Sequence, residues 1–308
     1  MCKYGRQSGL QRYRCSDCSL CFQSAPKARL ARNQTLWQEY VFNRKTFKVL
    51  NQETGLSHSQ LRRIVHATPE TKVAALKSIV QTVTLVIDTT YFDDFGVMVF
   101  RAWPERENLL WYFVGEESNV VYLLGLSELQ RRGYKIRAVV CDGKKWLPES
   151  ISSSGIPVQL CQFHLLKTVT KHLTKYPILP AGRELRHISL QLKYSTESEF
   201  KAALDAWLKD WSEFLKEKTI DPETGAWQYT HRRIRSAYKS ILSALPFLFT
   251  YQKFPQGLVP NTTNTLDGSF SQLKQKIHVH RGLNKQTQMK MVSTLLAAPA
   301  KKPTKKEH

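Results

Sequence analysis

The sequence predicts an α/β fold that carries an all-helical insertion. The first observation is a set of apolar, β-branched runs typical of buried strands, which cover residues 83–88, 96–103, 109–114, 135–141 and 158–161. The second is a helical pattern over residues 119–132, which separates the first three runs from the others. The third is a set of apolar side chains at helical spacing over 197–218 and 232–249. These helices contain more residues than the sheet domain requires, so they predict an insertion.

Composition limits the class of protein. The chain has 308 residues, with 46 Lys and Arg against 25 Asp and Glu, and a formal net charge of +21. A hydrophobic content of 42% excludes a wholly disordered chain. The nearest candidate for a membrane span, residues 240–249, is too short, and the N-terminus lacks the apolar core of a signal peptide. The charge predicts nucleic acid as partner, although a generically basic protein would show it too.

The positive charge is concentrated at both ends of the chain. Residues 1–66 hold 12 Lys and Arg and three acids, and residues 224–306 hold 14 Lys and Arg and one acid, Asp267. The other acids gather in 88–117 and 184–223. This pattern predicts two basic surfaces that flank a central domain with a different task. Residues 291–308 are predicted to form a disordered basic tail.

Cys15 and Cys18 form a Cys-x-x-Cys knuckle, whose two thiolates can reach one zinc ion. A closed zinc site needs four ligands, and Cys2 and Cys21 are the only other nearby thiols. We interpret the segment as half a zinc ribbon, whose first cysteine pair would fall before Met1. Reduced cysteines without metal explain the pattern equally well. Six cysteines without a scaffold pattern also predict a reducing cytoplasm.

Residues 46–66 predict two short helices joined at Gly55. The apolar spacing breaks at this glycine, which suits a left-handed turn residue, and Ser57 is a good N-cap for the second helix. In a helix-turn-helix the second helix presents its outward residues to the DNA major groove. The outward residues here are His58, Gln60, Arg62 and Arg63. An ordinary helical hairpin is the alternative, and the basic surroundings favour DNA binding.

Asp88 and Asp142 each follow a predicted buried strand. Three meandering strands, a helix closed by Gly133 and further parallel strands describe a ribonuclease-H-like arrangement. Functional groups of open α/β sheets collect where strands run out into loops, so we expect the two carboxylates to converge. Such a pair can hold magnesium ions for attack at phosphorus. The alternative is that each aspartate only caps its strand.

Asp267 lies on a predicted helix with one apolar stripe, formed by Leu266, Phe270, Leu273 and Ile277. The opposite face is polar and basic, so Asp267 is a lone carboxylate among cations. Such a carboxylate either makes a structural ion pair or completes a metal site, and taken alone it favours the ion pair. Together with Asp88 and Asp142 it becomes the candidate third ligand of a two-magnesium site.

Several segments together resemble the Mutator-like group of DDE transposases of bacterial insertion sequences, over about residues 12–285. The matching segments are Asp88 after its strand, Cys141-Asp142-Gly143, Cys161-Gln162-Phe163-His164, Asn261-Thr262-Thr263-Asn264-Thr265-Leu266-Asp267-Gly268 and His280-Arg281-Gly282-Leu283. The resemblance implies that Asp88, Asp142 and Asp267 are catalytic and that Cys161 and His164 support the active site. It also implies an N-terminal zinc ribbon and an all-helical insertion before the third acid.

Two features depart from the pattern of that group. Asp267 stands where the group normally has Glu, which is one methylene longer, and a positioned reaction is sensitive to such a change. The ribbon lacks its first cysteine pair, which suggests a truncated or decayed copy. Within the insertion, Trp207, Trp211 and Trp227 are candidates for stacking on a displaced base, although aromatic residues at helical spacing more often belong to a core.

The sequence thus predicts a bacterial cytoplasmic, nucleoid-associated transposase without a membrane segment, acting as a homo-oligomer on double-stranded DNA. The predicted parts are a partial zinc knuckle (1–30), a helix-turn-helix region (31–70), the first part of the ribonuclease-H-like core (80–175), the helical insertion (176–260), the last catalytic helix (261–290) and the tail (291–308). A decayed transposase that only binds DNA, and a nuclease of the same fold, are the alternatives.

Overall fold

The computed structural model describes residues 2–7, 10–23, 27–69, 71, 81–144, 146–220, 222–280 and 282–298. The chain divides into two compact units. The first combines Met1–Lys72 with Gln272–Ala298, and the second is built around Val73–Ser271. Among the described residues, no helix is both long and apolar enough to cross a membrane.

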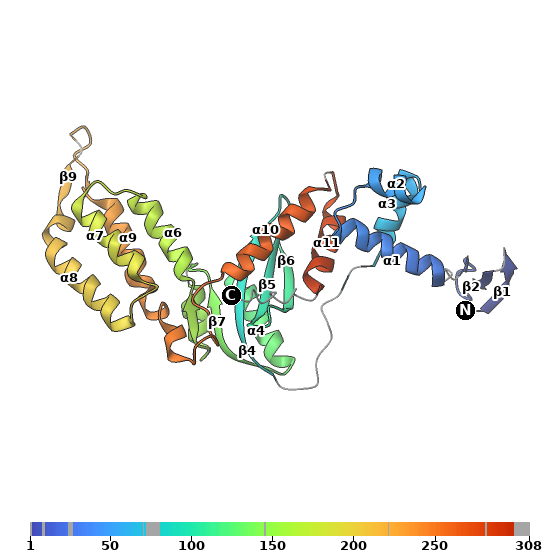
Figure 1. Ribbon diagram of the computed structural model, residues 1–308, viewed down its shortest axis with the longest axis horizontal. Helices are drawn as coiled ribbons and strands as arrows, with labels where there is room; N and C mark the ends of the chain where they lie inside the picture. The colour runs from blue at the N-terminus through green and yellow to red at the C-terminus, as the bar shows by residue number, and fades with distance from the viewer. Residues whose placement is uncertain are drawn as a thin grey trace, which may run out of the picture. The chain divides into compact units, whose positions relative to one another are not determined.

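The second unit contains a five-stranded mixed sheet (Figure 1). Its strands are β4 (Gln81–Tyr91), β5 (Gly96–Trp103), β6 (Asn108–Val114), β7 (Tyr134–Cys141) and β8 (Val158–Leu160), in the order β6-β5-β4-β7-β8. β4, β5 and β6 pair antiparallel, whereas β7 and β8 are parallel to β4. The prediction of a three-stranded meander followed by parallel strands is confirmed.

Helix α4 (Asn119–Arg131) connects β6 to β7 and packs closely on the sheet. A Cβ placed on Gly125 would lie 2.1 Å from the ring of Phe100, so only glycine permits this approach. Gly133 follows the helix with φ of +90°, as expected for a residue that closes it. Tyr122 of α4 is buried and packs edge-on against Phe100.

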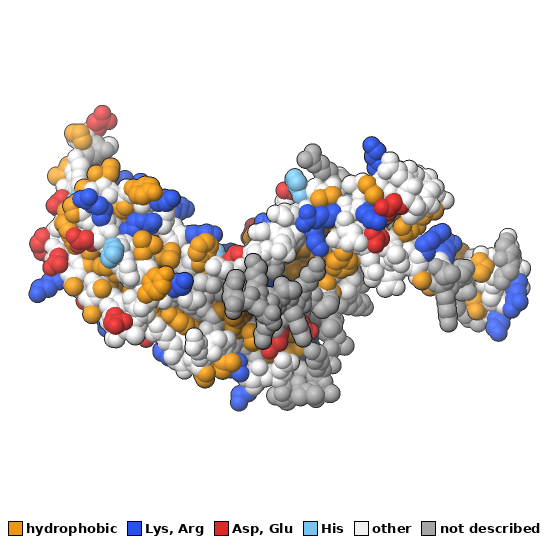
Figure 2. Space-filling view, viewed as in Figure 1, with side chains coloured by type: hydrophobic (Ala, Val, Ile, Leu, Met, Phe, Trp, Pro, Cys, Tyr) orange, Lys and Arg blue, Asp and Glu red, His pale blue; other side chains and the backbone are white. Residues whose placement is uncertain are grey.

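Helices α6 to α9 form a bundle that continues from β8 (Figure 1). The bundle and its connections comprise α6 (Gln162–Leu173), α7 (Pro180–Gln191), α8 (Glu197–Lys216), β9 (Lys218–Ile220), β10 (Trp227–Tyr229), α9 (Arg232–Ala244), η1 (Leu245–Phe247) and η2 (Thr250–Lys253). The predicted helix over 232–249 ends at Ala244, because Pro246 has no N–H for the next helical bond. On the face shown in Figure 2, charged side chains of both signs are interspersed over these helices.

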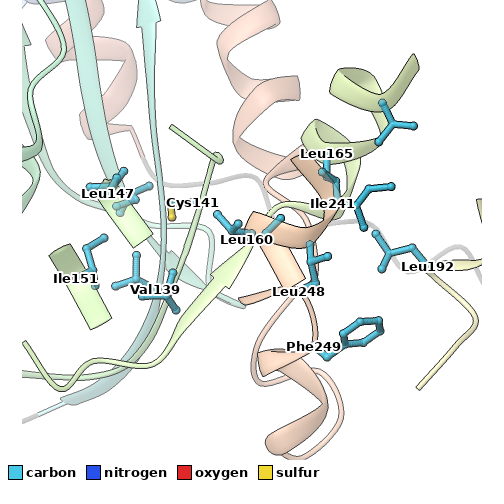
Figure 3. Close-up of a cluster of buried hydrophobic side chains, with 14 of the residues drawn as sticks. Val139, Cys141, Leu147, Ile151, Leu160, Leu165, Leu192, Ile241, Leu248 and Phe249 are labelled. Carbon is cyan, nitrogen blue, oxygen red and sulfur yellow. The ribbon is translucent and has the colours of Figure 1, made fainter. Parts of the chain in front are cut away.

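The bundle and the sheet share one hydrophobic core (Figure 3). Val139 of β7 and Leu160 of β8 lie at the sheet end of this core, and Ile241 and Leu248 lie at its helical end. Trp207 is buried in the bundle and donates its indole N–H to the Ala181 carbonyl oxygen at 3.0 Å. This tryptophan is therefore a core residue, which leaves it unable to stack on a displaced base.

The first unit contains a small antiparallel sheet and several helices. Its elements are β1 (Cys2–Gln7), β2 (Leu10–Arg14), β3 (Cys21–Gln23), α1 (Lys27–Phe42), α2 (Phe47–Thr54), α3 (His58–Ala67) and α11 (Lys285–Ala297). Gly55 ends α2 with φ of +67°, and Ser57 caps α3 through a reciprocal capping box with Gln60. The predicted glycine turn and N-cap are confirmed. Helix α10 (Asn264–His278) begins in the second unit.

The prediction of a disordered tail from residue 291 is wrong for residues 291–297. These residues complete helix α11, whose apolar side chains Met291, Val292 and Leu296 are buried. Burial of this face outweighs the basic composition that suggested disorder, and α11 contacts α1 in the same unit. Residues 299–308 of the predicted tail lie outside the described residues.

Candidate active site

Asp88 lies within strand β4, so the prediction that it follows the strand is wrong. The parallel pairing of β4 with β7 ends at Val86, whereas the antiparallel pairing with β5 continues to Tyr91. Asp88 therefore lies in β4 two residues beyond Val86, the last residue of β4 that pairs with β7. The hairpin with β5 keeps this part of β4 extended, which a hydrophobic run in the sequence does not reveal.

The Asp88 carboxyl is only 8% exposed, and its Oδ1 accepts the Thr89 N–H at 2.8 Å. Burial raises its pKa from 3.8 to about 6, and the charges of Asp267 and Asp142 add to the effect. Three carboxylates thus interact electrostatically in this part of the molecule. Repulsion of this kind favours a neutral acid or a bound cation.

Asp142 directly follows β7, as predicted, and its Oδ1 accepts the Gly143 N–H. Asp267 lies in the first turn of α10. Its Oδ2 accepts the hydroxyl of Thr263 at 3.1 Å, which restricts the carboxylate to one orientation. Both acids are partly exposed, so they are accessible to solvent and to a ligand.

His164 of α6 lies between these two acids. Its Nδ1 is 4.0 Å from Asp142 Oδ1, and its Nε2 is 3.9 Å from Asp267 Oδ1. A hydrogen bond with Cys161 is the largest cause that raises the pKa of His164 to about 9, and both carboxylates contribute. At neutral pH the ring is therefore an imidazolium between two carboxylates.

Cys161 is buried and links His164 to the segment that precedes α10. The Thr263 N–H donates to Cys161 Sγ at 3.3 Å, and the Thr263 hydroxyl lies 3.4 Å from His164 Nδ1. Burial opposes ionisation, yet the hydrogen bonds from His164 and Thr263 lower the pKa of Cys161 overall. The Cys-x-x-His segment therefore holds together the two parts of the chain that carry Asp142 and Asp267.

Arg101 anchors helix α10 to the sheet. The sequence analysis did not predict a role for this residue. This residue of β5 is buried, and its Nη1 donates to Thr265 O at 3.0 Å and to Ser269 Oγ at 2.6 Å. Its Nε donates to Asn108 Oδ1 at 2.8 Å. The two partners in α10 lie two positions before and two positions after Asp267 in the sequence. Arg101 therefore fixes the turn of the helix that carries this carboxylate.

The sequence also did not predict a hydrogen-bond network that begins at Thr89, the residue after Asp88. The hydroxyl of Tyr122 lies 2.9 Å from Thr89 Oγ1 and donates to Glu117 Oε1 at 2.6 Å. Glu117 forms an ion pair with Lys144, two residues after Asp142. The abundance of acids in residues 88–117 was the only signal for Glu117 in the sequence, because its partners are distant along the chain.

The donor chemistry of the three aspartates fits magnesium, which prefers carboxylate oxygens. The structural observation that supports this fit is the burial of the Asp88 carboxyl, which is only 8% exposed and feels the charges of Asp267 and Asp142. Within the described residues, no group of three or more His, Cys, Asp or Glu side chains is already arranged around one metal position. His164, between Asp142 and Asp267, occupies the space where these two acids would share an ion.

Cys15 and Cys18 lie in a turn of the N-terminal sheet, in which Ser19 N–H donates to the Cys15 carbonyl oxygen at 3.1 Å. Hydrogen bonds from the backbone of Cys18 and Asp17, and from the Cys18 side chain, lower the pKa of the Cys15 thiol. The two thiols are thus close together, as the knuckle predicts. Among the residues that the structure describes, neither Cys2 nor Cys21 joins Cys15 and Cys18 as a third ligand.

The predicted DNA-binding residues of α3 are exposed. His58, Arg62 and Arg63 project from the helix, whereas Leu61 and Val65 on the opposite face are buried. Gln60 is exposed too, but its Oε1 accepts the N–H of Ser57 at 2.9 Å. Its amide nitrogen and the second lone pair of Oε1 can still bond another partner.

Comparisons with known proteins identify a family. The model of the family described as "Transposase, Mutator family" matches residues 105–300, a range that includes Asp142, Cys161, His164 and Asp267. None of the curated proteins matches the chain.

Two solved structures resemble the fold weakly. The Drosophila P element transposase strand transfer complex is 10% identical, with a TM-score of 0.42, over 86% of this chain and 91% of that chain. The simian T-cell lymphotropic virus intasome in complex with the PP2A regulatory subunit B56 gamma is 9% identical, with a TM-score of 0.23, over 67% and 65%. The family assignment depends on the sequence match, which covers more than half of the chain: the chain belongs to the Mutator family of transposases.

Proposed function

We propose that this chain is a DDE-type transposase, which cuts DNA at the ends of its element and joins the free 3′ ends to a target. The observation that carries the proposal is the approach of Asp142, at the end of β7, and Asp267, at the start of α10, to within 4.0 and 3.9 Å of the two ring nitrogens of His164. Asp88 lies near enough for the charges of both acids to raise its pKa. The strand order β6-β5-β4-β7-β8 supports a ribonuclease-H-like catalytic domain.

Asp88, Asp142 and Asp267 would hold magnesium ions, which activate the attacking oxygen and stabilise the leaving oxygen when bound. The remaining residues orient these ligands. Thr263 holds the Asp267 carboxylate in one orientation, and His164 would offset part of the negative charge of Asp142 and Asp267. Residues that orient metal ligands typically change activity by about 10- to 100-fold when mutated.

The experiment uses a supercoiled plasmid that carries the gene with its native flanking DNA. In Mg²⁺ the wild-type protein should nick this DNA at the element ends, whereas Asp267→Asn should not nick it. DNA affinity should stay the same or rise, because one negative charge near the phosphates is removed. Asp267→Glu should keep or increase nicking. A structural ion pair predicts instead that Asp267→Asn still cuts and melts at a lower temperature.

We further propose that helix α3 binds the element ends. The support is the exposed basic face of α3 opposite its buried Leu61 and Val65. Replacing Arg62 and Arg63 with Ala should weaken binding and reduce the slope of log affinity against log salt by about 1 per lost phosphate contact. Equal binding by a fragment that starts after residue 70 would contradict this assignment.

A decayed copy that only binds DNA is the second candidate. It is favoured by the position of His164, which already pairs with two of the three acids. Wild-type protein that binds the plasmid ends but never nicks them, together with a silent Asp267→Glu variant, would select this candidate.

A further inference from the structure

Trp146 is displayed at the surface in a way that its neighbours are not. Its side chain is 73% exposed, whereas Leu147, Pro148 and Ile151 of α5 (Leu147–Ser152) are buried. Its backbone adopts the left-handed conformation, with φ of +69°. Non-glycine residues rarely adopt this conformation, and such strain concentrates at functional sites. The segment therefore turns a large aromatic ring outward rather than into the core.

A cavity of about 460 Å³ opens beside this ring. This volume lies within the range of about 300–1,000 Å³ typical of sites for small ligands. Asp142 and His164, which belong to the candidate active site, line one part of the cavity, and Trp146 lines another. The apolar Leu165 and Phe247 also contribute to the lining. A nucleotide whose phosphate lies at the carboxylates is thus adjacent to the cavity.

Hydroxyl groups of α6 and α9 complete the lining, and each donates its proton to a backbone carbonyl of its own helix. Thr168 donates to His164 O at 3.1 Å, Ser240 to Ser236 O at 2.8 Å, and Ser243 to Ser240 O at 3.2 Å. Each oxygen keeps lone pairs that can accept a hydrogen bond from a group bound in the cavity. Such acceptors suit the amino and imino N–H groups at the edge of a nucleobase.

We propose that this cavity binds one unstacked nucleobase of the DNA strand at the active site, with Trp146 stacked on its face. The proposal rests on the proposed function, because DNA must lie at the three aspartates for the base to reach the cavity. Enzymes that act on DNA commonly move a nucleotide out of the helix and hold it between aromatic and polar groups. Lys144, whose ammonium group pairs with Glu117, also lines the cavity.

The test uses a forked DNA duplex with 2-aminopurine at the first unpaired nucleotide, measured without divalent metal so that no cleavage is needed. Wild-type protein should change the fluorescence of the 2-aminopurine on binding. Trp146→Ala should abolish this change and weaken binding of the fork by between about fivefold and a hundredfold, as expected for the loss of one stacked base. Trp146→Phe retains an aromatic face and should keep most of both effects.

Trp227→Ala is the matched control, because Trp227 is 55% exposed on β10 and contacts Lys218 rather than the cavity. It should behave as wild type. A second readout replaces the unpaired base with 5-iodouracil, whose photo-crosslink should map to Trp146 by mass spectrometry. Trp146→Ala protein that retains the fluorescence change, or equal losses in Trp227→Ala, would overturn the proposal.

The two proposals fail differently. A protein that never nicks plasmid DNA, yet shows the Trp146-dependent fluorescence change, refutes the proposed catalysis and leaves the base site intact. A protein that nicks the element ends at the wild-type rate after Trp146→Ala, with unchanged fluorescence on the fork, refutes the base site alone.

Discussion

Replacing Asp88 with Asn should stabilise the metal-free protein at neutral pH, although it removes a proposed catalytic group. Burial, with help from Asp267 and Asp142, raises the pKa of Asp88 from 3.8 to about 6. The folded protein thus holds this proton more tightly than the unfolded chain does, so stability falls as pH rises from about 4 to 6. A shift of about 2 units at 1.36 kcal/mol each corresponds to about 3 kcal/mol. Asn has the same shape and can still accept the Thr89 N–H.

The assay is thermal melting in EDTA at pH 4.5 and pH 7.5. At pH 7.5 Asp88→Asn should melt roughly 6–12 °C above wild type, from about 2–4 °C per kcal/mol for a unit of this size. At pH 4.5 the difference should be much smaller, because Asp88 is then largely protonated in the folded protein. Asp93→Asn, which removes an exposed carboxylate, is the control. An equal melting difference at both pH values, or destabilisation at pH 7.5, would refute the reasoning.

Three further predictions concern stability and zinc. His164→Gln should lower the melting temperature at pH 6.5 but not above pH 9.5. The raised pKa of His164 contributes stability to the folded protein, which is fully present below pH 6.5 and is lost as the pH rises through about 9. Gly125→Ala should cost about 1–3 kcal/mol in denaturant melts because its Cβ would meet Phe100, whereas Gly115→Ala, with open space around it, should cost far less. Elemental analysis should find less than one zinc per chain; stoichiometric zinc that is lost in Cys15→Ser would contradict this prediction.

The spacing of apolar residues, together with turn and helix-capping residues, predicted much of the fold. The strands, the turn at Gly55 and the cap at Ser57 follow from local sequence, because each depends on backbone preferences and on one buried face. The exposed face of α3 follows from the same periodicity. Helix α1 and the end of α11 were missed, because their mutual packing depends on chain segments that are far apart in the sequence.

The site could be predicted only in part. The three aspartates were proposed from strand ends and a lone acid, and the resemblance pointed to Cys161 and His164. The placement of His164 between Asp142 and Asp267 could not be predicted, because it depends on how α6 and α10 meet. The bonds of Arg101 to α10 join residues more than 160 positions apart, and local patterns carry no information on them.

The most direct test of the account is a change of metal specificity at Asp267. Asp267→Cys should fail to nick the plasmid in Mg²⁺, which prefers oxygen ligands, and should regain nicking in Mn²⁺, which accepts sulfur more readily. Wild type should nick in both ions, and Asp93→Cys should match wild type in both. Rescue by Mn²⁺ would establish that the side chain at position 267 binds the metal. Nicking by Asp267→Cys at the wild-type rate in Mg²⁺, or no rescue by Mn²⁺ while the variant folds and binds DNA, would contradict the account.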